Sequence, residues 1–331
     1  MVVSANTFLD GSVELPDPPK NGGLNQYQRS PRGRARERRA LQGFVGARRW
    51  LRTLGGKASE DEQCRQLRLV ISLRTTRKQE QESRWCSSAA SARTCRRGDF
   101  RYVNLSRRFR VICYDNRGAG RTDAPDQPYS VAQMADDLAA LMDELRIDAA
   151  HVLGWSMGGL IAQAFAHAHP RRVRKLILMS TMERPDGFVR LAIRNWVNIR
   201  RSDMSFEQIV RFASRWSYSP ALYENEPLYE KFIQVMATNP YAQKAHAFLR
   251  QADALLAYDP REPANPVRVQ TLVLVGVHDS LVPPYHSERL AQGIPGATLR
   301  MLSGAHAGFV EFPDEYNAEI VKFLQTPSTQ G

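Results

Sequence analysis

The stretch "AHVLGWSMGGLIAQAFA", residues 150–166, decides the fold. An apolar run ends at Gly154, a serine follows between Trp155 and Met157, two more glycines come next, and a helical pattern then begins. The pattern G-x-S-x-G at the junction of a strand and a helix predicts a sharp turn that lifts Ser156 above a sheet. The backbone of such a turn is strained, so the residues two positions away must be small. We interpret Ser156 as a nucleophile; the alternatives are a phosphate-binding glycine turn or simple packing.

Apolar runs and amphipathic segments alternate on both sides of this stretch. Buried strands are predicted over residues 109–115, 150–155, 173–181, 269–279 and 297–304, and helices over 130–147, 157–168, 285–293 and 313–325. Ser130 is the expected N-cap of the first of these helices. Strands that alternate with helices predict an α/β fold with a mostly parallel sheet and helices on both faces.

One long segment, residues 184–265, interrupts this alternation. Its pattern is mostly helical and it is rich in aromatic residues and methionine. We expect it to form a helical cap over the ends of the strands. Its aromatic side chains suggest an apolar pocket, although packing within a core is the other role for such residues. Those singled out are Trp196, Trp216, Tyr218 and Tyr223.

The net charge of +12 is concentrated in the first third of the chain. Residues 1–110 carry a net charge of +14, and the remaining residues carry −2. The charge therefore says little about the chemistry of the later, near-neutral part. Apart from a short strand expected over 67–74, residues 1–103 lack a helical or alternating period, so we expect a poorly ordered, arginine-rich segment. The predicted core then comprises 104–183 and 266–331.

Length and composition restrict the class of protein. The 331 residues suffice for one large core or two modest ones. No apolar run is long enough to span a membrane, and the first residues lack a secretory pattern, so we expect a cytoplasmic protein. The four cysteines fit no zinc pattern, and Cys113 is expected to be a small core residue.

A serine nucleophile requires a base and a carboxylate that orients the base. In this architecture the acid follows the serine along the chain and the histidine follows the acid. His306, in "MLSGAHAGFVEFP" directly after the last predicted strand, is the predicted base. Asp279 ends the run "TLVLVGVHD" and is the predicted acid, because a carboxylate at the end of a buried strand is costly without a partner.

Other assignments remain open for both residues. Asp259 and Glu262 are the alternative acids, and Asp279 itself could simply form the turn before Ser280. The other two histidines that follow the cap, His278 and His286, flank the loop after the preceding strand. The alternative interpretation of His306 is that it is simply a histidine in a surface loop. Residue type and chain order alone do not decide which of these side chains come together.

Four segments together resemble the α/β-hydrolase superfamily: "FRVICYDNRGAGRTDAP", "GWSMGG", "LVLVGVHDSLVP" and "SGAHAGFVEFPDEYNAEIVKFL". They are similar in particular to capped esterases and 3-oxoadipate enol-lactonase-like members, over about residues 104–327. The resemblance implies that Ser156, Asp279 and His306 form a catalytic triad and that the backbone N–H of Met157 is one oxyanion donor. It implies no metal and no organic cofactor.

The resemblance fails in residues 1–103. The family needs about three earlier strands and a glycine-rich loop that supplies the second oxyanion donor, and no such loop is readable there. Read one base out of frame, however, codons for "SRWCSSAASARTCRRG" (83–98) permit "PVVLIGGLGADLSAW", an apolar strand followed by a glycine-rich loop. We hypothesise that part of residues 1–100 is translated out of frame. Loss of an oxyanion donor would lower kcat by about 10²–10³-fold.

The leading functional prediction is a serine hydrolase that acts on small carboxylic esters or lactones through an acyl-enzyme. Peroxidation, acyl transfer, lyase chemistry and C–C bond cleavage use similar residues on the same fold. An aspartate nucleophile is disfavoured because Ser156 occupies that position. Two alternatives come from other classes: a nucleic-acid-binding protein that uses the arginine-rich segment, and a non-catalytic binding protein. Nucleic-acid binding is less favoured because aromatic residues are sparse in that segment.

Overall fold

The computed structural model describes residues 84–87, 105, 108–260 and 267–327. The predictions for 1–83 and 88–104, including the strand over 67–74, lie outside these residues, as does Glu262. Residues 84–87 are described only as backbone. They form a strand inside the segment that the sequence predicts to be poorly ordered.

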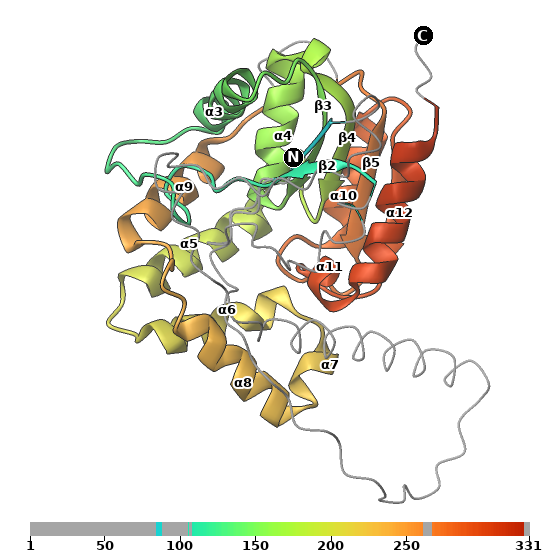
Figure 1. The fold of residues 1–331 in the computed structure, drawn as a ribbon. Coiled ribbons are helices and arrows are strands. Elements are labelled where there is room, and N and C mark those ends of the chain that lie inside the picture. Colours follow the sequence, from blue (N-terminus) through green and yellow to red (C-terminus); the bar gives the residue numbers. More distant parts are fainter. Residues whose placement is uncertain (1–83, 88–104, 106–107, 261–266, 328–331) are drawn as a thin grey trace, which may run out of the picture.

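The described strands form one sheet in which neighbouring strands are all parallel. The strands are β1 (Arg84–Ser87), β2 (Arg110–Ile112), β3 (Ala150–Trp155), β4 (Val173–Met179), β5 (Thr271–Gly276) and β6 (Thr298–Leu302). Their order is β2-β1-β3-β4-β5-β6, so β1 lies between β2 and β3 (Figure 1). The predicted parallel α/β sheet is therefore confirmed, although β2 is shorter than the predicted run over 109–115.

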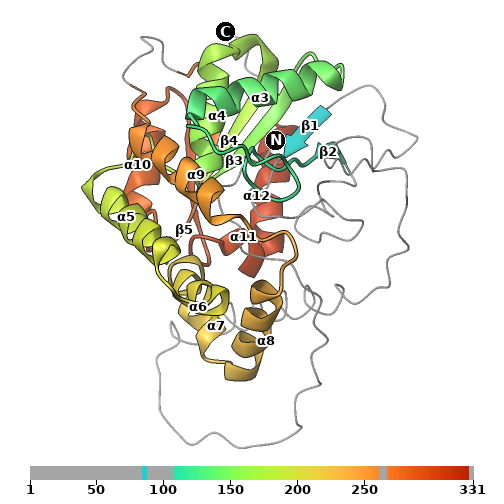
Figure 2. The same cartoon turned by 90° about the vertical axis from the view of Figure 1, so that its left-hand side faces the viewer.

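Helices cover both faces of the sheet (Figures 1 and 2). They are α3 (Val131–Glu144), α4 (Met157–Ala168) and α10 (Pro284–Gly293) on one face, and α12 (Pro313–Gln325), preceded by the short α11 (Gly308–Glu311), on the other. A short 3-10 helix, η3 (Pro170–Arg172), leads into β4.

Alternate residues of β4 show how the two faces are filled. Leu176 and Leu178 belong to the apolar cluster under α3, α4 and α10, whereas Ile177 and Met179 belong to the cluster under α12. All four side chains are buried. This alternation is the two-residue period of a strand that is covered on both sides. Cys113 is also buried, in the second cluster, as the sequence predicts.

The helical insertion between β4 and β5, which we call the cap, contains five helices in its described part, up to residue 260. They are α5 (Gly187–Arg201), α6 (Phe206–Ser217), α7 (Pro220–Tyr223), α8 (Glu226–Ala237) and α9 (Ala245–Ala257). Side-chain N-caps begin three of them: Asp186, Ser205 and Asn225 each accept a hydrogen bond from the backbone N–H three residues later. Figure 1 shows the cap gathered at one end of the sheet.

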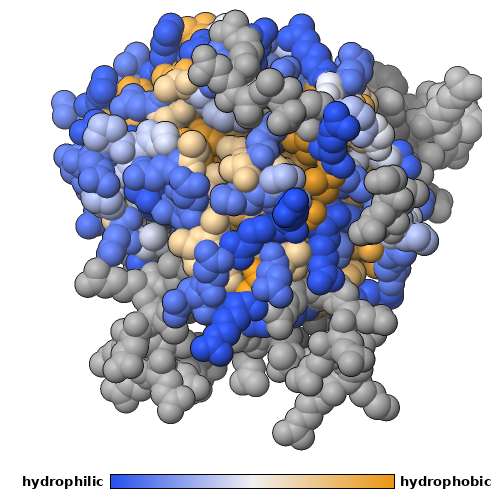
Figure 3. Space-filling view, turned by 90° about the horizontal axis from the view of Figure 1, so that it is seen from above, coloured by the Kyte–Doolittle hydropathy of each residue, from blue (hydrophilic) through white to orange (hydrophobic). Residues whose placement is uncertain are grey.

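The cap is hydrogen-bonded to the loop that follows β2. The Arg121 guanidinium donates to Tyr241 Oη at 2.7 Å and lies 4.2 Å from the centre of that ring. Gln243 Nε2 donates to the Gly118 carbonyl at 3.0 Å. These contacts join residues more than 100 positions apart and hold the cap against the core. Seen from above relative to Figure 1, the described surface shows apolar areas surrounded by hydrophilic residues (Figure 3).

Candidate active site

Ser156 occupies a strained turn between β3 and α4. Its φ of +56° and ψ of −126° lie in a region that non-glycine residues rarely adopt. Hydrogen bonds from the end of β4 hold the turn, since Ser156 N donates to the Met179 carbonyl at 2.9 Å and Thr181 Oγ1 donates to the Ser156 carbonyl at 2.7 Å. The main chain on both sides of the serine is thereby fixed.

Glycines on either side of the turn leave space for backbone and side-chain atoms. A Cβ added to Gly154 would lie 2.3 Å from the carbonyl oxygen of Gly158, and one added to Gly159 would lie 2.4 Å from Thr181 Oγ1. Real Cβ atoms do not approach so closely. Gly154 is therefore required by its contact with the start of α4, as the sequence predicts for a position two residues from the serine, and Gly159 is required by its contact with Thr181 beyond the end of β4.

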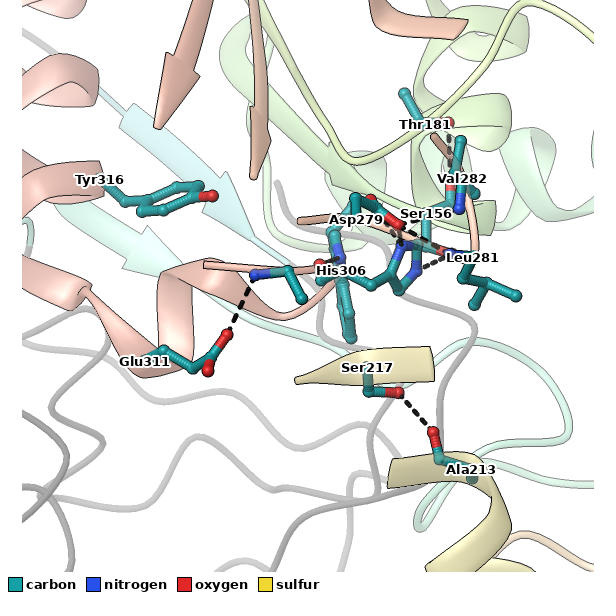
Figure 4. Close-up of polar contacts among 12 residues, drawn as sticks. Ser156, Thr181, Ala213, Ser217, Asp279, Leu281, Val282, His306, Glu311 and Tyr316 are labelled. Atoms are coloured by element: carbon teal, nitrogen blue, oxygen red, sulfur yellow. Dashed lines mark hydrogen bonds and ion pairs between the residues drawn. The ribbon is translucent and has the colours of Figure 1, made fainter. Parts of the chain in front are cut away.

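The structure brings Ser156, His306 and Asp279 together, although up to 150 positions separate them in the chain (Figure 4). His306 Nε2 lies 2.9 Å from Ser156 Oγ, and His306 Nδ1 lies 2.9 Å from Asp279 Oδ2 and 3.1 Å from Oδ1. If the Nδ1 proton is donated to the carboxylate, Nε2 has a lone pair for the serine hydroxyl. His306 is fully buried and the other two are nearly so.

Asp279 is oriented by its own turn. Its Oδ1 accepts hydrogen bonds from the backbone N–H groups of Leu281 at 3.1 Å and Val282 at 2.9 Å. This turn follows β5 directly. With the imidazole Nδ1–H of His306 as the third donor, this carboxylate has three hydrogen-bond donors. These hydrogen bonds explain how a carboxylate is accommodated at the end of a buried strand.

Met157, the predicted oxyanion donor, is the first residue of α4. Backbone N–H groups in the first turn of a helix have no partner within the helix, and the positive end of the helix dipole lies there. This position suits a developing negative charge next to Ser156 Oγ. Residues 88–104, which follow β1, lie outside the described residues, and no second donor is assigned.

Two residues that sequence reasoning missed hold the His306 loop. Trp155 Nε1 donates to the His306 carbonyl at 2.8 Å, and its ring centre lies 5.3 Å from that of the imidazole. Glu311 Oε2 accepts a hydrogen bond from Ala305 N at 3.1 Å. A charged residue inside the otherwise apolar run "FVEFP" is the signal that could have drawn attention to Glu311.

The alternative residues lie elsewhere. His278 is exposed, and His286 is buried on α10 with Nε2 3.5 Å from Asp186 Oδ2. Asp259 is exposed just beyond the end of α9. It is His306 that contacts Ser156, and it is Asp279 that contacts His306.

A cavity of about 550 Å³ lies between the cap and the turn that contains Asp279. Cap residues at the end of α6 and in α7 line it, together with the two neighbours of Asp279: Arg215, Tyr218, Pro220, Tyr223, Glu224, His278 and Ser280. Two of the four aromatic residues predicted to line a pocket, Tyr218 and Tyr223, are among them. Trp196 instead is buried in the core, and Trp216 packs against the same apolar cluster.

Within the residues that the structure describes, no group of three or more histidine, cysteine, aspartate or glutamate side chains is arranged to hold a metal ion. None of the helices in the described part of the chain is both long enough and apolar enough to cross a bilayer.

Comparisons with known proteins identify the family. Residues 101–313 match the family model of the alpha/beta hydrolase fold. A protein of Azorhizobium caulinodans named "Putative carbamate hydrolase RutD" is 35% identical over 224 residues, which cover 66% of this chain and 82% of that protein. The 3-oxoadipate enol-lactonase 2 of Acinetobacter baylyi is 29% identical over 210 residues, 63% of this chain and 76% of the relative.

Solved structures give the same result. The enol-lactonase from Burkholderia xenovorans superposes with a TM-score of 0.65 at 26% identity and covers 78% of this chain and 96% of that one. A hydrolase from Pseudomonas aeruginosa gives a TM-score of 0.67 at 27% identity and covers 78% and 94%. The sheet, the cap and the serine turn define an α/β hydrolase. The chain belongs to the α/β-hydrolase family, as the resemblance predicts.

Proposed function

We propose that this protein is a serine hydrolase whose nucleophile is Ser156, whose general base is His306 and whose orienting acid is Asp279. The observation that carries the proposal is the continuous hydrogen-bond series from Ser156 Oγ through the imidazole to the Asp279 carboxylate, with 2.9 Å at each step. Nucleophilic catalysis by serine requires this arrangement, in which the base reaches the hydroxyl and a carboxylate fixes the base.

The geometry supports a two-stage reaction. Ser156 Oγ attacks the carbonyl carbon while His306 Nε2 takes the hydroxyl proton, and the backbone N–H of Met157 stabilises the negative oxygen that forms. The C–O bond to the leaving group then breaks as the imidazolium returns the proton to the departing oxygen. Water activated by His306 attacks the acyl-enzyme, which releases the acid and restores the Ser156 hydroxyl.

Small carboxylic esters and lactones are the proposed substrates. The similarity to enol-lactonases, by sequence and by structure, favours this class. A second candidate class is carbamates, which the 35% identity to the RutD protein favours. Both classes present a trigonal acyl carbon to the serine, so the same residues act on either, and a substrate panel containing both distinguishes them.

The decisive experiment is covalent labelling of the full-length protein with a fluorophosphonate, which reacts with an activated serine. We expect Ser156 to be labelled and the Ser156→Ala variant to be silent, whereas Ser280→Ala, at a serine that lines the neighbouring cavity, retains labelling. Labelling that survives Ser156→Ala refutes the assignment of the nucleophile. Folded wild-type protein that takes no label instead supports the non-catalytic alternative.

The nucleic-acid-binding alternative depends on the arginine-rich residues 29–52, which lie outside the described residues. Salt-dependent retention of the full-length protein on immobilised DNA, together with an absence of labelling, would favour it over the hydrolase.

A further inference from the structure

Glu311, the last residue of α11, places a carboxyl group between the cap and the loop that carries His306. Its Oε1 accepts two hydrogen bonds from Ser219 of the cap, from the backbone N at 2.9 Å and from Oγ at 2.6 Å. Its Oε2 accepts from the backbone N of Ala305 at 3.1 Å, one residue before the histidine. Figure 4 shows the carboxyl group directed at this loop. A single side chain therefore links residues 219 and 305.

A second link lies on the other side of the histidine. The backbone N of Ala307 donates to the carbonyl of Ser217, the last residue of α6, at 2.8 Å. Between these two links, the carbonyl of His306 itself accepts the Trp155 indole N–H. Three consecutive residues of the loop are thus held, the outer two through the cap segment 217–219. The position of the imidazole therefore depends on the position of the cap segment 217–219.

Every group that faces the Glu311 carboxyl in these contacts is a donor: two N–H groups and one hydroxyl. A carboxylate, which only accepts, satisfies all of them. An amide of the same size does not, because its NH₂ must point at one of the donors. Partial burial of the carboxyl raises its pKa, and the Ser219 and Ala305 hydrogen bonds oppose this effect. The site therefore requires the chemistry of glutamate and not only its shape.

We propose that Glu311 is a positioning residue that fastens the catalytic-histidine loop to the cap and so holds His306 Nε2 within hydrogen-bond distance of Ser156 Oγ. This inference rests on the proposed serine hydrolase function. Glu311 touches neither the serine nor the imidazole in the contacts described, and it acts through Ala305 N. Its effect on the reaction is therefore an effect on the alignment of the base, and a misalignment of about 1 Å costs about 10² in rate.

The test is Glu311→Gln in the full chain, with Glu315→Gln as the matched control. Glu315 also accepts a hydrogen bond from the backbone of the same loop, from Ser303 N at 3.3 Å, but it is exposed and no hydrogen bond joins it to the cap among the described contacts. We expect Glu311→Gln to lower both kcat and the rate of fluorophosphonate labelling by about 10–100-fold, with KM changed by less than about threefold. Glu315→Gln stays within about twofold of the wild type.

A purely structural role predicts a different result. Loosening of the cap alone would raise KM and lower the melting temperature while leaving the labelling rate unchanged, and that outcome overturns the inference. Wild-type protein that labels no faster than Glu311→Gln overturns it as well. If the wild type takes no label at all, the proposed function fails first, so the two failures are distinguishable.

Two further variants keep the test decisive if Glu311→Gln does not fold. Ser219→Ala removes the hydroxyl donor and leaves both backbone contacts, so we expect a loss in kcat of a few-fold. Glu311→Asp keeps an acceptor-only group on a shorter side chain, so it should fold and recover part of the rate lost in Glu311→Gln. Full activity in both variants would contradict the inference.

Discussion

Replacement of Gly154 by alanine tests whether close packing around the serine turn controls both stability and activity. The new Cβ would lie 2.3 Å from the Gly158 carbonyl oxygen, 2.6 Å from its carbonyl carbon and 2.7 Å from the Gly159 Cα. All three atoms are backbone atoms of the first turn of α4. Ordinary contact begins at 3.4 Å, so strand and helix must separate by about 1 Å at the closest point.

The size of the effect follows from this displacement. Overpacking of this kind costs about 1–3 kcal/mol of unfolding free energy. A shift of about 1 Å at the turn moves Ser156 Oγ relative to His306, which lowers kcat by about 10²-fold. Urea unfolding followed by circular dichroism measures the first quantity, and steady-state hydrolysis of an activated ester measures the second.

The matched control is Gly293→Ala at the end of α10. There the added Cβ meets no atom within 4 Å, and alanine in a helix is more favourable than glycine by about 0.5–1 kcal/mol. We expect this variant to be at least as stable as the wild type and fully active. If Gly154→Ala matches Gly293→Ala in stability and keeps its kcat, the packing argument for the turn is wrong.

Two other substitutions test the site and its surroundings. Asp279→Asn keeps an acceptor for Leu281 N and Val282 N but turns an NH₂ group toward His306 Nδ1, so the imidazole takes the wrong tautomer. We expect kcat to fall by about 10⁴-fold with little change in KM, and a loss below tenfold in steady-state assays would contradict this. Burial raises the pKa of Asp115, in the loop after β2, from 3.8 to about 7, so its contribution to stability is present below about pH 4 and is lost as the pH rises through 7. Asp115→Asn lacks this titration, so its unfolding free energy relative to the wild type should rise by about 4 kcal/mol between pH 4 and pH 8; a difference that stays constant over this range in urea unfolding would refute the assignment.

Much of the core was predictable because local sequence determines it. The helices expected over 285–293 and 313–325 are observed as α10 (Pro284–Gly293) and α12 (Pro313–Gln325), each beginning at a proline, which suits the first turn of a helix. Ser130 caps α3 as predicted, with its Oγ accepting from Gln133 N at 3.0 Å. The serine turn was predictable because Gly154 is required by contacts with Gly158 and Gly159, only four and five residues later.

The supports of His306 were not predictable, because they depend on how distant segments pack. Glu311 meets Ser219, 92 positions earlier, and Trp155 meets His306, 151 positions later. No local sequence pattern predicts either of these two pairs. The chemical identity of the candidate residues could be predicted from the order of serine, acid and histidine, whereas the means by which the loop is held required the three-dimensional arrangement of the cap.

The strand β1 was also not predicted. The sequence "RWCS" has no period typical of a strand, and it is defined by pairing with β2 on one side and β3 on the other. It lies within residues 83–98, the segment whose shifted reading frame permits an apolar strand. The out-of-frame hypothesis stays a prediction, which sequencing of the gene tests.

The placement of β1 limits how the polypeptide can be shortened. Adjacent strands lie about 4.8 Å apart, so a fragment that starts at residue 105 would leave a gap of nearly 10 Å between β2 and β3, with main-chain amides and carbonyls on both sides unmatched. A shortened chain made for crystallisation or expression therefore has to start upstream of residue 84, so that it keeps β1. The arginine-rich segment 1–103 looks dispensable when judged by composition, yet it contains the strand that connects β2 to β3 in the middle of the sheet.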